Sequence, residues 1–116
     1  MQTLEIGPLS IKWGSQTYVM GIMNATPDSF SGDGLLQDSR DIVETAVAQA
    51  RRFVAEGAHI LDVGGESTRP GAEPVSEAEE LDRIAPIVEA IAREVEAAIS
   101  IDTYKASVAR AALDAG

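Results

Sequence analysis

Three short apolar runs, each followed at once by polar residues, constrain the fold of this chain more than any other feature. The runs are Val19–Met23, Ala58–Val63 and Ala98–Ile101. Runs of this length are typical of buried parallel strands. A helical pattern follows each run, so the sequence predicts a β-loop-α unit three times over. Strands that alternate with helices favour an α/β fold with a parallel sheet.

The helical segments carry recognisable start and stop signals. The first is expected over about Arg40–Glu56, with Gly57 as the residue that ends it. The second begins after Ser76, which stands three residues before a Glu in the form of a capping box. Pro86 lies within this second helix and is expected to kink or split it. The third helix is expected over Ala106–Ala115.

Residues 1–18 are expected to form a β-hairpin ahead of the three units. Ile11 and Trp13 alternate with polar residues, Gly14 and Ser15 supply a turn, and Thr17–Val19 is the returning strand. Trp13 is then expected to pack in the core or over it. The hairpin would cap one end of the repeat.

The polar residues that follow the three strands are expected to meet at one site. Asn24 follows the first strand, Gly64–Arg69 the second and Asp102 the third. Because parallel strands place their carboxyl ends at one edge of the sheet, these residues should converge there. The first loop, from Asn24 to about Gln37, is also longer than the roughly 2–6 residues usual for such a connection. This convergence favours an enzyme.

Composition excludes several classes of function. The 116 residues include 19 acidic and 9 basic side chains, and this net charge of −10 argues against nucleic acid as a partner. The chain has no cysteine, no signal peptide and no apolar run near the ~20 residues that span a bilayer, so we expect a cytoplasmic protein without membrane contact. The acidic side chains of Glu73–Glu96 are expected to line a solvent-exposed helix face.

Three longer motifs resemble the dihydropteroate synthase family. They are NATPDSFSGDG from Asn24, ILDVGGESTRPGA from Ile60 and SIDTYKASVARAALDAG from Ser100. The resemblance implies a TIM (β/α)8 barrel, which takes about 250 residues. Residues 1–116 would be its N-terminal part, with a hairpin, the first three βα units and no complete second domain. It also implies a transferase of folate biosynthesis, a sulfonamide target, that condenses dihydropterin methyl diphosphate with 4-aminobenzoate and releases diphosphate.

The resemblance also implies roles for individual residues. Asn24, Arg69 and Asp102 are the expected catalytic residues. Asn24 would engage the diphosphate and ligate Mg²⁺, the implied cofactor; Arg69 would contact the diphosphate; and Asp102 would bind the pterin ring. The other expected substrate-binding residues are Thr26, Phe30, Ser67, Thr68 and Pro70. Two ordinary alternatives stay open, since Arg69 could be a paired surface residue and Asp102 could cap the last helix.

Two other functions also stay open at this point. One is a non-catalytic pterin- or diphosphate-binding module, and the other is the pterin domain of a folate-dependent methyltransferase. The family's later functional groups do not occur in these 116 residues, so the chain alone is expected to be inactive. An unpaired third strand should make it self-associate, whereas the full-length family is expected to form homodimers. The reading frame beyond Gly116 would discriminate among these functions.

Overall fold

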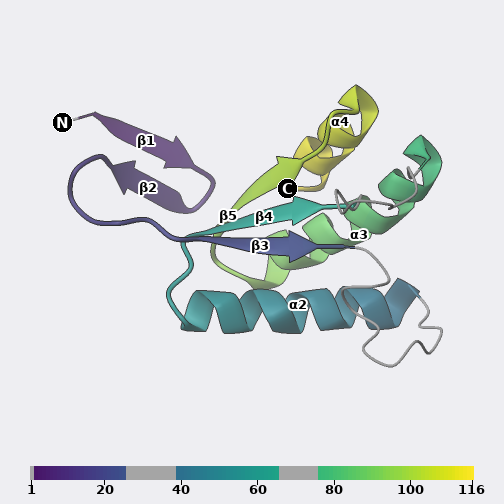
Figure 1. Cartoon of the computed structure of the whole chain (residues 1–116), viewed down its shortest axis with the longest axis horizontal. Helices are drawn as coiled ribbons and strands as arrows, with labels where there is room; N and C mark the ends of the chain where they lie inside the picture. The colour runs from purple at the N-terminus through teal and green to yellow at the C-terminus, as the bar shows by residue number, and fades with distance from the viewer. Residues whose placement is uncertain (1, 26–38, 66–75) are drawn as a thin grey trace, which may run out of the picture.

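The computed structural model describes residues 2–25, 39–65 and 76–116 (Figure 1). Two sheets are present in these residues: an antiparallel hairpin, β1-β2, and a parallel sheet in the order β3-β4-β5. The parallel α/β fold expected from the sequence is therefore confirmed. The elements, in chain order, are β1 (Thr3–Ile6), β2 (Leu9–Lys12), β3 (Met20–Asn24), α2 (Ser39–Ala55), β4 (Ile60–Gly64), α3 (Glu77–Glu94), β5 (Ala98–Asp102) and α4 (Ala106–Ala115).

The described helices all pack on one face of the parallel sheet, and none of them covers the other face. Met23, Leu61 and Val63 are buried on the covered face, in a core completed by side chains of α2, α3 and α4. Met20 and Ile22 alternate with Met23 along β3 and are 47% and 57% exposed. We call the side on which they lie the helix-free face. In β3, and in β4 up to Val63, the more buried residues alternate with the more exposed ones, as expected for a sheet with one covered face.

Helix α2 packs closely on β3 because Gly21 leaves room for it. A Cβ atom at Gly21 would lie 2.6 Å from Cδ2 of Phe53. The helix then ends as the sequence predicted. Gly57 has a φ of 114°, and the N–H groups of Gly57 and Ala58 donate to the carbonyl oxygens of Val54 and Phe53 at 3.1 and 2.9 Å. These two bonds form a Schellman motif, which glycine favours because it tolerates positive φ.

Helix α3 runs without a break from Glu77 to Glu94, although Pro86 lies inside it. The predicted split is therefore wrong. Ile84 and Ile87, on either side of the proline, are 0% and 1% exposed, and burial of this apolar stripe outweighs the backbone hydrogen bond that proline removes. The predicted N-cap is confirmed, since the Ser76 hydroxyl accepts from the N–H of Glu79 at 3.2 Å.

The hairpin exists, but its strands and turn differ from those expected. β1 and β2 are joined at Gly7 and Pro8, where Gly7 has a φ of 54°, the conformation that a tight hairpin turn requires at its first position. Trp13 is 54% exposed rather than in the core. The alternation that buries Ile11 does not extend to Trp13, because β2 ends at Lys12.

The hairpin lies beside the end of the sheet at which the strands begin, on the left in Figure 1. The segment between the hairpin and β3 contacts His59, whose Nδ1 accepts from the N–H of Val19 at 3.0 Å. Among the described helices, none is both long enough and apolar enough to cross a membrane.

Candidate functional site

Asn24, Gly64 and Asp102 form one row across the carboxyl ends of the three parallel strands. Asn24 pairs in register with Gly64, and Gly64 pairs with Asp102. Partners in a parallel register direct their side chains to the same face, so this row belongs to the helix-free face. Neighbouring strands lie about 4.8 Å apart, which places the Asn24 and Asp102 Cα atoms roughly 10 Å from each other. The predicted convergence of the strand ends is confirmed.

Gly64 places no side chain between Asn24 and Asp102. A Cβ atom built on Gly64 would lie 3.5 Å from Cβ and 3.6 Å from Oδ2 of Asp102, so the carboxylate of Asp102 lies beside this glycine. The row thus presents an amide and a carboxylate on either side of a residue without a side chain. Such a gap suits a ligand that donates hydrogen bonds or carries a hard cation.

A second polar row lies one step further down the same face. Asp62 pairs in register with Ile22 on one side and with Ser100 on the other. Both Asp62 and Ser100 are partly exposed. The sequence patterns assigned neither residue to the site. Their positions two residues before Gly64 and Asp102 could have done so, because strand residues two apart share a face.

Asp102 does not cap helix α4. The N-cap position is Lys105, and no side chain forms a capping hydrogen bond there. The N–H of Lys105 instead donates to the hydroxyl of Thr103 at 3.1 Å. The helix-cap alternative for Asp102 is therefore wrong, and its exposed carboxylate is available on the helix-free face.

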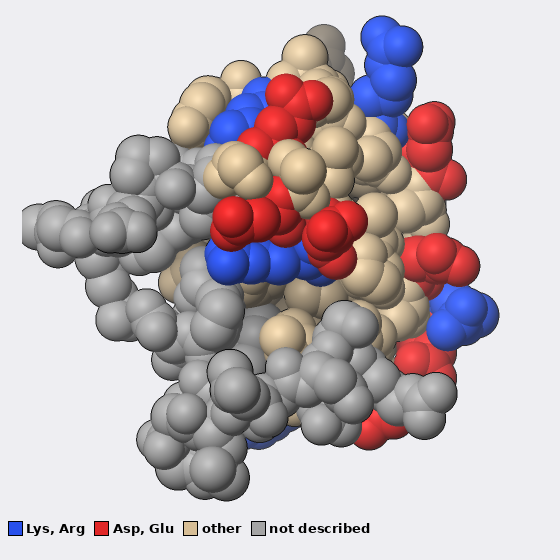
Figure 2. All heavy atoms as spheres, turned by 90° about the vertical axis from the view of Figure 1, so that its right-hand side faces the viewer, with Lys and Arg blue, Asp and Glu red and all other residues tan. Residues whose placement is uncertain are grey.

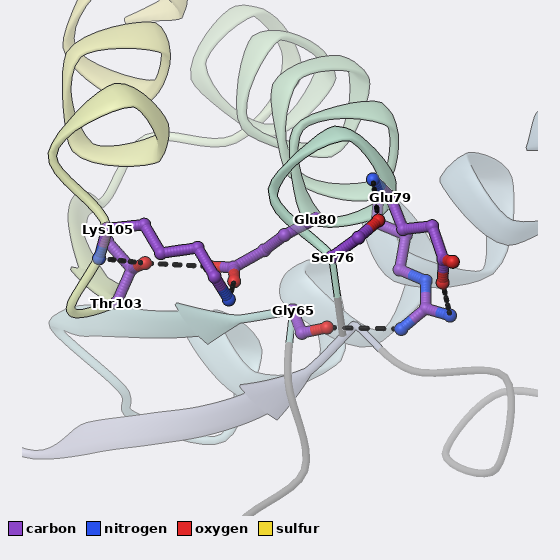
Figure 3. Close-up of polar contacts among 7 residues, drawn as sticks. Gly65, Ser76, Glu79, Glu80, Thr103 and Lys105 are labelled. Carbon is purple, nitrogen blue, oxygen red and sulfur yellow. Dashed lines mark hydrogen bonds and ion pairs between the residues drawn. The ribbon is translucent and has the colours of Figure 1, made fainter. Parts of the chain in front are cut away.

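A buried carboxylate lies behind the strand ends, on the covered side of the sheet. Glu80 of α3 is 1% exposed. Its Oε2 accepts from the hydroxyl of Thr103 at 2.7 Å, and its Oε1 pairs with Nζ of Lys105 at 2.6 Å (Figure 3). The expectation that the acidic residues of this helix face solvent is wrong at Glu80. The signal was available, because Glu80 precedes the buried Ile84 by four residues and so continues its stripe.

Arg83 connects the same helix to the end of β4. Its Nη1 donates to the carbonyl oxygen of Gly65 at 3.1 Å, and its Nη2 lies 3.7 Å from Oε2 of Glu79. Gly65 itself lies against α3, since a Cβ atom there would be 2.9 Å from Cγ1 of Ile84 and 3.0 Å from Cγ of Glu80. The first two turns of α3 therefore contact the residues that follow both β4 and β5.

Figure 2 looks onto this end of the molecule, toward which the strand arrows of Figure 1 point. Basic side chains lie among acidic ones near the centre of the view. Charges of opposite sign placed this closely favour local pairing, as in the Glu80–Lys105 ion pair, over a broad field of one sign.

The remaining expected site residues lie outside the described residues. They are Thr26, Phe30, Ser67, Thr68, Arg69 and Pro70. Within residues 2–25, 39–65 and 76–116, no group of three or more His, Cys, Asp or Glu side chains could hold a metal ion. Asn24 is thus the one expected metal ligand that the described part of the chain contains.

An open groove of about 900 Å³ lies elsewhere, between α2 and α3. Val43, Val47, Pro86 and Ala90 line it, together with charged side chains that include Arg51 and Glu94. The guanidinium of Arg51 and the carboxylate of Glu94 lie 3.5 Å apart and largely satisfy each other. Because the groove lies between helices rather than at the strand ends, it contains none of the candidate residues.

Comparison with known proteins gives consistent matches. A family model described as pterin binding enzyme matches residues 20–116. A dihydropteroate synthase of Synechocystis sp. is 53% identical over 97% of this chain and 38% of its own length. The Xanthomonas albilineans dihydropteroate synthase solved with 4-aminobenzoic acid has a TM-score of 0.85 and 44% identity, covering 98% of this chain and 40% of that one.

A third match is the Burkholderia cenocepacia dihydropteroate synthase complexed with 7,8-dihydropteroate. It has a TM-score of 0.73 and 46% identity, covering 98% of this chain and 35% of that one. The chain therefore spans about two fifths of the length of the relatives that it matches.

Proposed function

Because the chain belongs to the pterin binding enzyme family, we propose that it supplies one edge of the active site of a dihydropteroate synthase. That enzyme joins dihydropterin methyl diphosphate to 4-aminobenzoate. In this proposal β3, β4 and β5 are the first three strands of a (β/α)8 barrel, and the helix-free face is turned toward the barrel interior. The similarity to solved synthases over nearly the whole chain supports this arrangement.

The observation that carries the proposal is the row Asn24–Gly64–Asp102. It brings two side chains that are 78 positions apart in the sequence to the same edge and the same face of the sheet. In barrels of this class the carboxyl edge is where substrates bind. The row therefore supports a binding role for both residues better than a purely structural one.

Asp102 is proposed to recognise the pterin. A carboxylate accepts several hydrogen bonds and donates none, which suits a ring edge that presents N–H and amino groups. Bonds to a charged acceptor are roughly twice as strong as those between neutral groups. Asp102 is exposed at the end of β5, beside a residue without a side chain, so its carboxylate is accessible to the ring.

Asn24 is proposed to bind the diphosphate and to supply one ligand to Mg²⁺. The amide oxygen is a hard donor, and Mg²⁺ commonly takes one or two protein oxygens while phosphate and water complete its shell. Bound Mg²⁺ would neutralise charge on the departing diphosphate.

Residues of the two loops are proposed to complete the site. Arg69 would pair with the diphosphate, because a guanidinium matches phosphate oxygens in a bidentate manner. The proposed substrate contacts beside it are Thr26, Phe30, Ser67, Thr68 and Pro70.

The proposed chemistry is a substitution at the pterin methylene carbon. The amino nitrogen of 4-aminobenzoate forms a bond to this carbon, the bond from the carbon to the diphosphate oxygen breaks, and the nitrogen loses one proton. Asn24, Arg69 and Asp102 would hold the two ends of the pterin substrate so that the carbon is exposed to the nitrogen.

Substitution of Asp102 by Asn tests this function in the protein expressed at its natural length. The change keeps the shape but turns one acceptor into a donor, which would face a donor on the ring. Such a mismatch costs about 1–3 kcal/mol, so calorimetry should show the affinity for dihydropterin diphosphate falling roughly ten- to a hundredfold.

Asp114→Asn provides a matched control, because Asp114 is an exposed residue of α4 and its loss changes the charge equally. The control should bind the pterin like the unsubstituted protein. Unchanged pterin affinity in a folded Asp102→Asn variant would contradict the assignment.

A further inference from the structure

Both oxygens of the buried Glu80 carboxylate are used by residues that follow Asp102. Oε2 accepts from the Thr103 hydroxyl at 2.7 Å and Oε1 pairs with Nζ of Lys105 at 2.6 Å. The Glu80 and Lys105 side chains are only 2% and 14% exposed. A buried ion pair adds little net stability on average, although removing one partner is strongly destabilising. Stability alone is therefore a weak explanation for the burial of the Glu80–Lys105 pair.

The hydrogen bonds of Thr103 show which segment the contacts of Glu80 hold in place. Its hydroxyl donates to Glu80 and at the same time accepts from the N–H of Lys105. The turn from Asp102 to Lys105 is thus fixed to α3 at two side chains and closed by an internal hydrogen bond. Asp102 precedes Thr103 directly and, by its register with Gly64, lies on the helix-free face, whereas Thr103 is bonded to α3, which covers the other face.

From this geometry we infer that Glu80 is a positioning residue. By holding Thr103 and Lys105 on the covered side of the sheet, it fixes the orientation of the Asp102 carboxylate on the helix-free side. The ligand that Asp102 meets is the pterin of the proposed function, on which this part of the inference rests. Glu80 itself has no access to that ligand, since it is 1% exposed on the other side of the sheet.

The contact of Arg83 with Gly65 supports the same role for α3. One turn after Glu80, the guanidinium of Arg83 holds the carbonyl oxygen of Gly65 at 3.1 Å. Gly65 follows the central member of the row Asn24–Gly64–Asp102. The helix therefore fixes the chain just beyond two adjacent members of that row.

Glu80→Gln is the direct test, again in the protein at its natural length. Glutamine keeps the size and can still accept from Thr103, but it removes the charge that pairs with Nζ of Lys105 at 2.6 Å. Glu77→Gln is the matched control, because Glu77 lies in the same first turn and is exposed. A second variant, Glu80→Gln with Lys105→Met, removes both charges of the buried Glu80–Lys105 pair and serves if the single variant does not fold.

Pterin affinity gives the first readout. We expect Glu80→Gln to weaken binding of dihydropterin diphosphate about tenfold and Glu77→Gln to leave it unchanged. The paired variant should recover thermal stability but not affinity. In an Asp102→Asn background, Glu80→Gln should cost less than about twofold, because residues that act through one another are not additive. If the effects of Asp102→Asn and Glu80→Gln on affinity were fully additive, Glu80 would have only a structural role. The same conclusion would follow if the paired variant recovered affinity together with stability.

The carboxyl ¹³C resonance of Asp102 in the ligand-free protein gives the second readout. Asp102→Asn identifies the signal. We expect Glu80→Gln to shift or broaden it while Glu77→Gln does not. An unmoved signal overturns the inference even when the pterin binds. If the unsubstituted protein binds no pterin, the proposed function fails, and this spectrum still decides whether Glu80 orients Asp102.

Discussion

Gly64 and Gly65 are adjacent in the sequence but have opposite surroundings. A Cβ atom at Gly64 would make ordinary contacts of 3.5–3.6 Å with Asp102, whereas one at Gly65 would lie 2.9 Å from Ile84 and 3.0 Å from Glu80. A methyl group at Gly64 would meet only Asp102 at ordinary contact distance, whereas the missing side chain at Gly65 lets α3 approach the sheet. Under the proposed function, the first position would affect binding and the second stability.

We predict that alanine at these two positions gives opposite phenotypes. Gly65→Ala should lower the free energy of unfolding by about 1–3 kcal/mol, because the new methyl group overpacks the contact with α3. Gly64→Ala should change that free energy by less than about 1 kcal/mol but weaken pterin binding, because its methyl group enters the space beside Asp102.

Urea unfolding and calorimetry on both variants measure the two effects, and each variant serves as the control for the other. Equal losses of stability, or unaltered ligand affinity in Gly64→Ala, would contradict this division.

The sequence indicated the position of some candidate site residues but not of others, for a physical reason. Asn24 and Asp102 could be predicted because each is the first polar residue after an apolar run, and strand ends converge in a parallel sheet. Glu80 could not be predicted by charge alone, since a glutamate on a helix is usually solvated. Its burial depends on Lys105, which is 25 positions away, and such a pairing is visible only once the fold is known.

At the scale of elements, the first turn of α3 is stabilised by an N-cap and also contains Glu80. The Ser76 hydroxyl accepts from the N–H of Glu79, and the same turn carries Glu80. A frayed N-terminus would therefore disturb the contacts of Glu80 as well as the helix itself.

We predict that Ser76→Ala lowers the free energy of unfolding by about 1 kcal/mol, the usual cost of losing an N-cap. Ser76→Asp should keep stability close to that of the unsubstituted protein, because its carboxylate can accept the same bond and also faces the positive end of the helix dipole. Chemical denaturation measures both. If the two variants lose equal stability, the hydroxyl does not act as a cap.

The elements were predicted best where local signals agree with tertiary packing. The bounds of α4 and the ends of α2 and β5 follow from capping residues and apolar patterns. The hairpin was misplaced because two glycine-containing turns, at Gly7 and at Gly14, are close in sequence and only pairing decides between them. The split expected at Pro86 was wrong because the sequence shows the local cost of a helical proline, whereas the burial that offsets this cost depends on the whole core.

At the scale of the whole molecule, the sheet leaves apolar surface uncovered. Val19, Met20 and Ile22 are 48%, 47% and 57% exposed. In the part of the chain that the structure describes, β3 and β5 are the outer strands of the parallel sheet. Exposed apolar patches and open strand edges are the usual sites of association between chains.

We therefore predict that the 116-residue chain, prepared by itself, self-associates through β3. Sedimentation velocity should show the average mass rising with concentration. Ile22→Glu should reduce this association, while Leu113→Glu, on the exposed surface of α4, should not. A monomer at every concentration, or equal effects of both substitutions, would contradict association through this face.

The alternation along β3 and β4 has a consequence for how the protein can vary. Positions such as Met23 and Leu61 are limited by volume, because they fill the core, whereas Asn24 and Asp62 lie on the other face and are not buried. Under the proposed function, substitutions at Asn24 or Asp62 would therefore alter ligand preference with little loss of core packing. A strand built in this way lets selection change specificity along one face while the packed face stays constant.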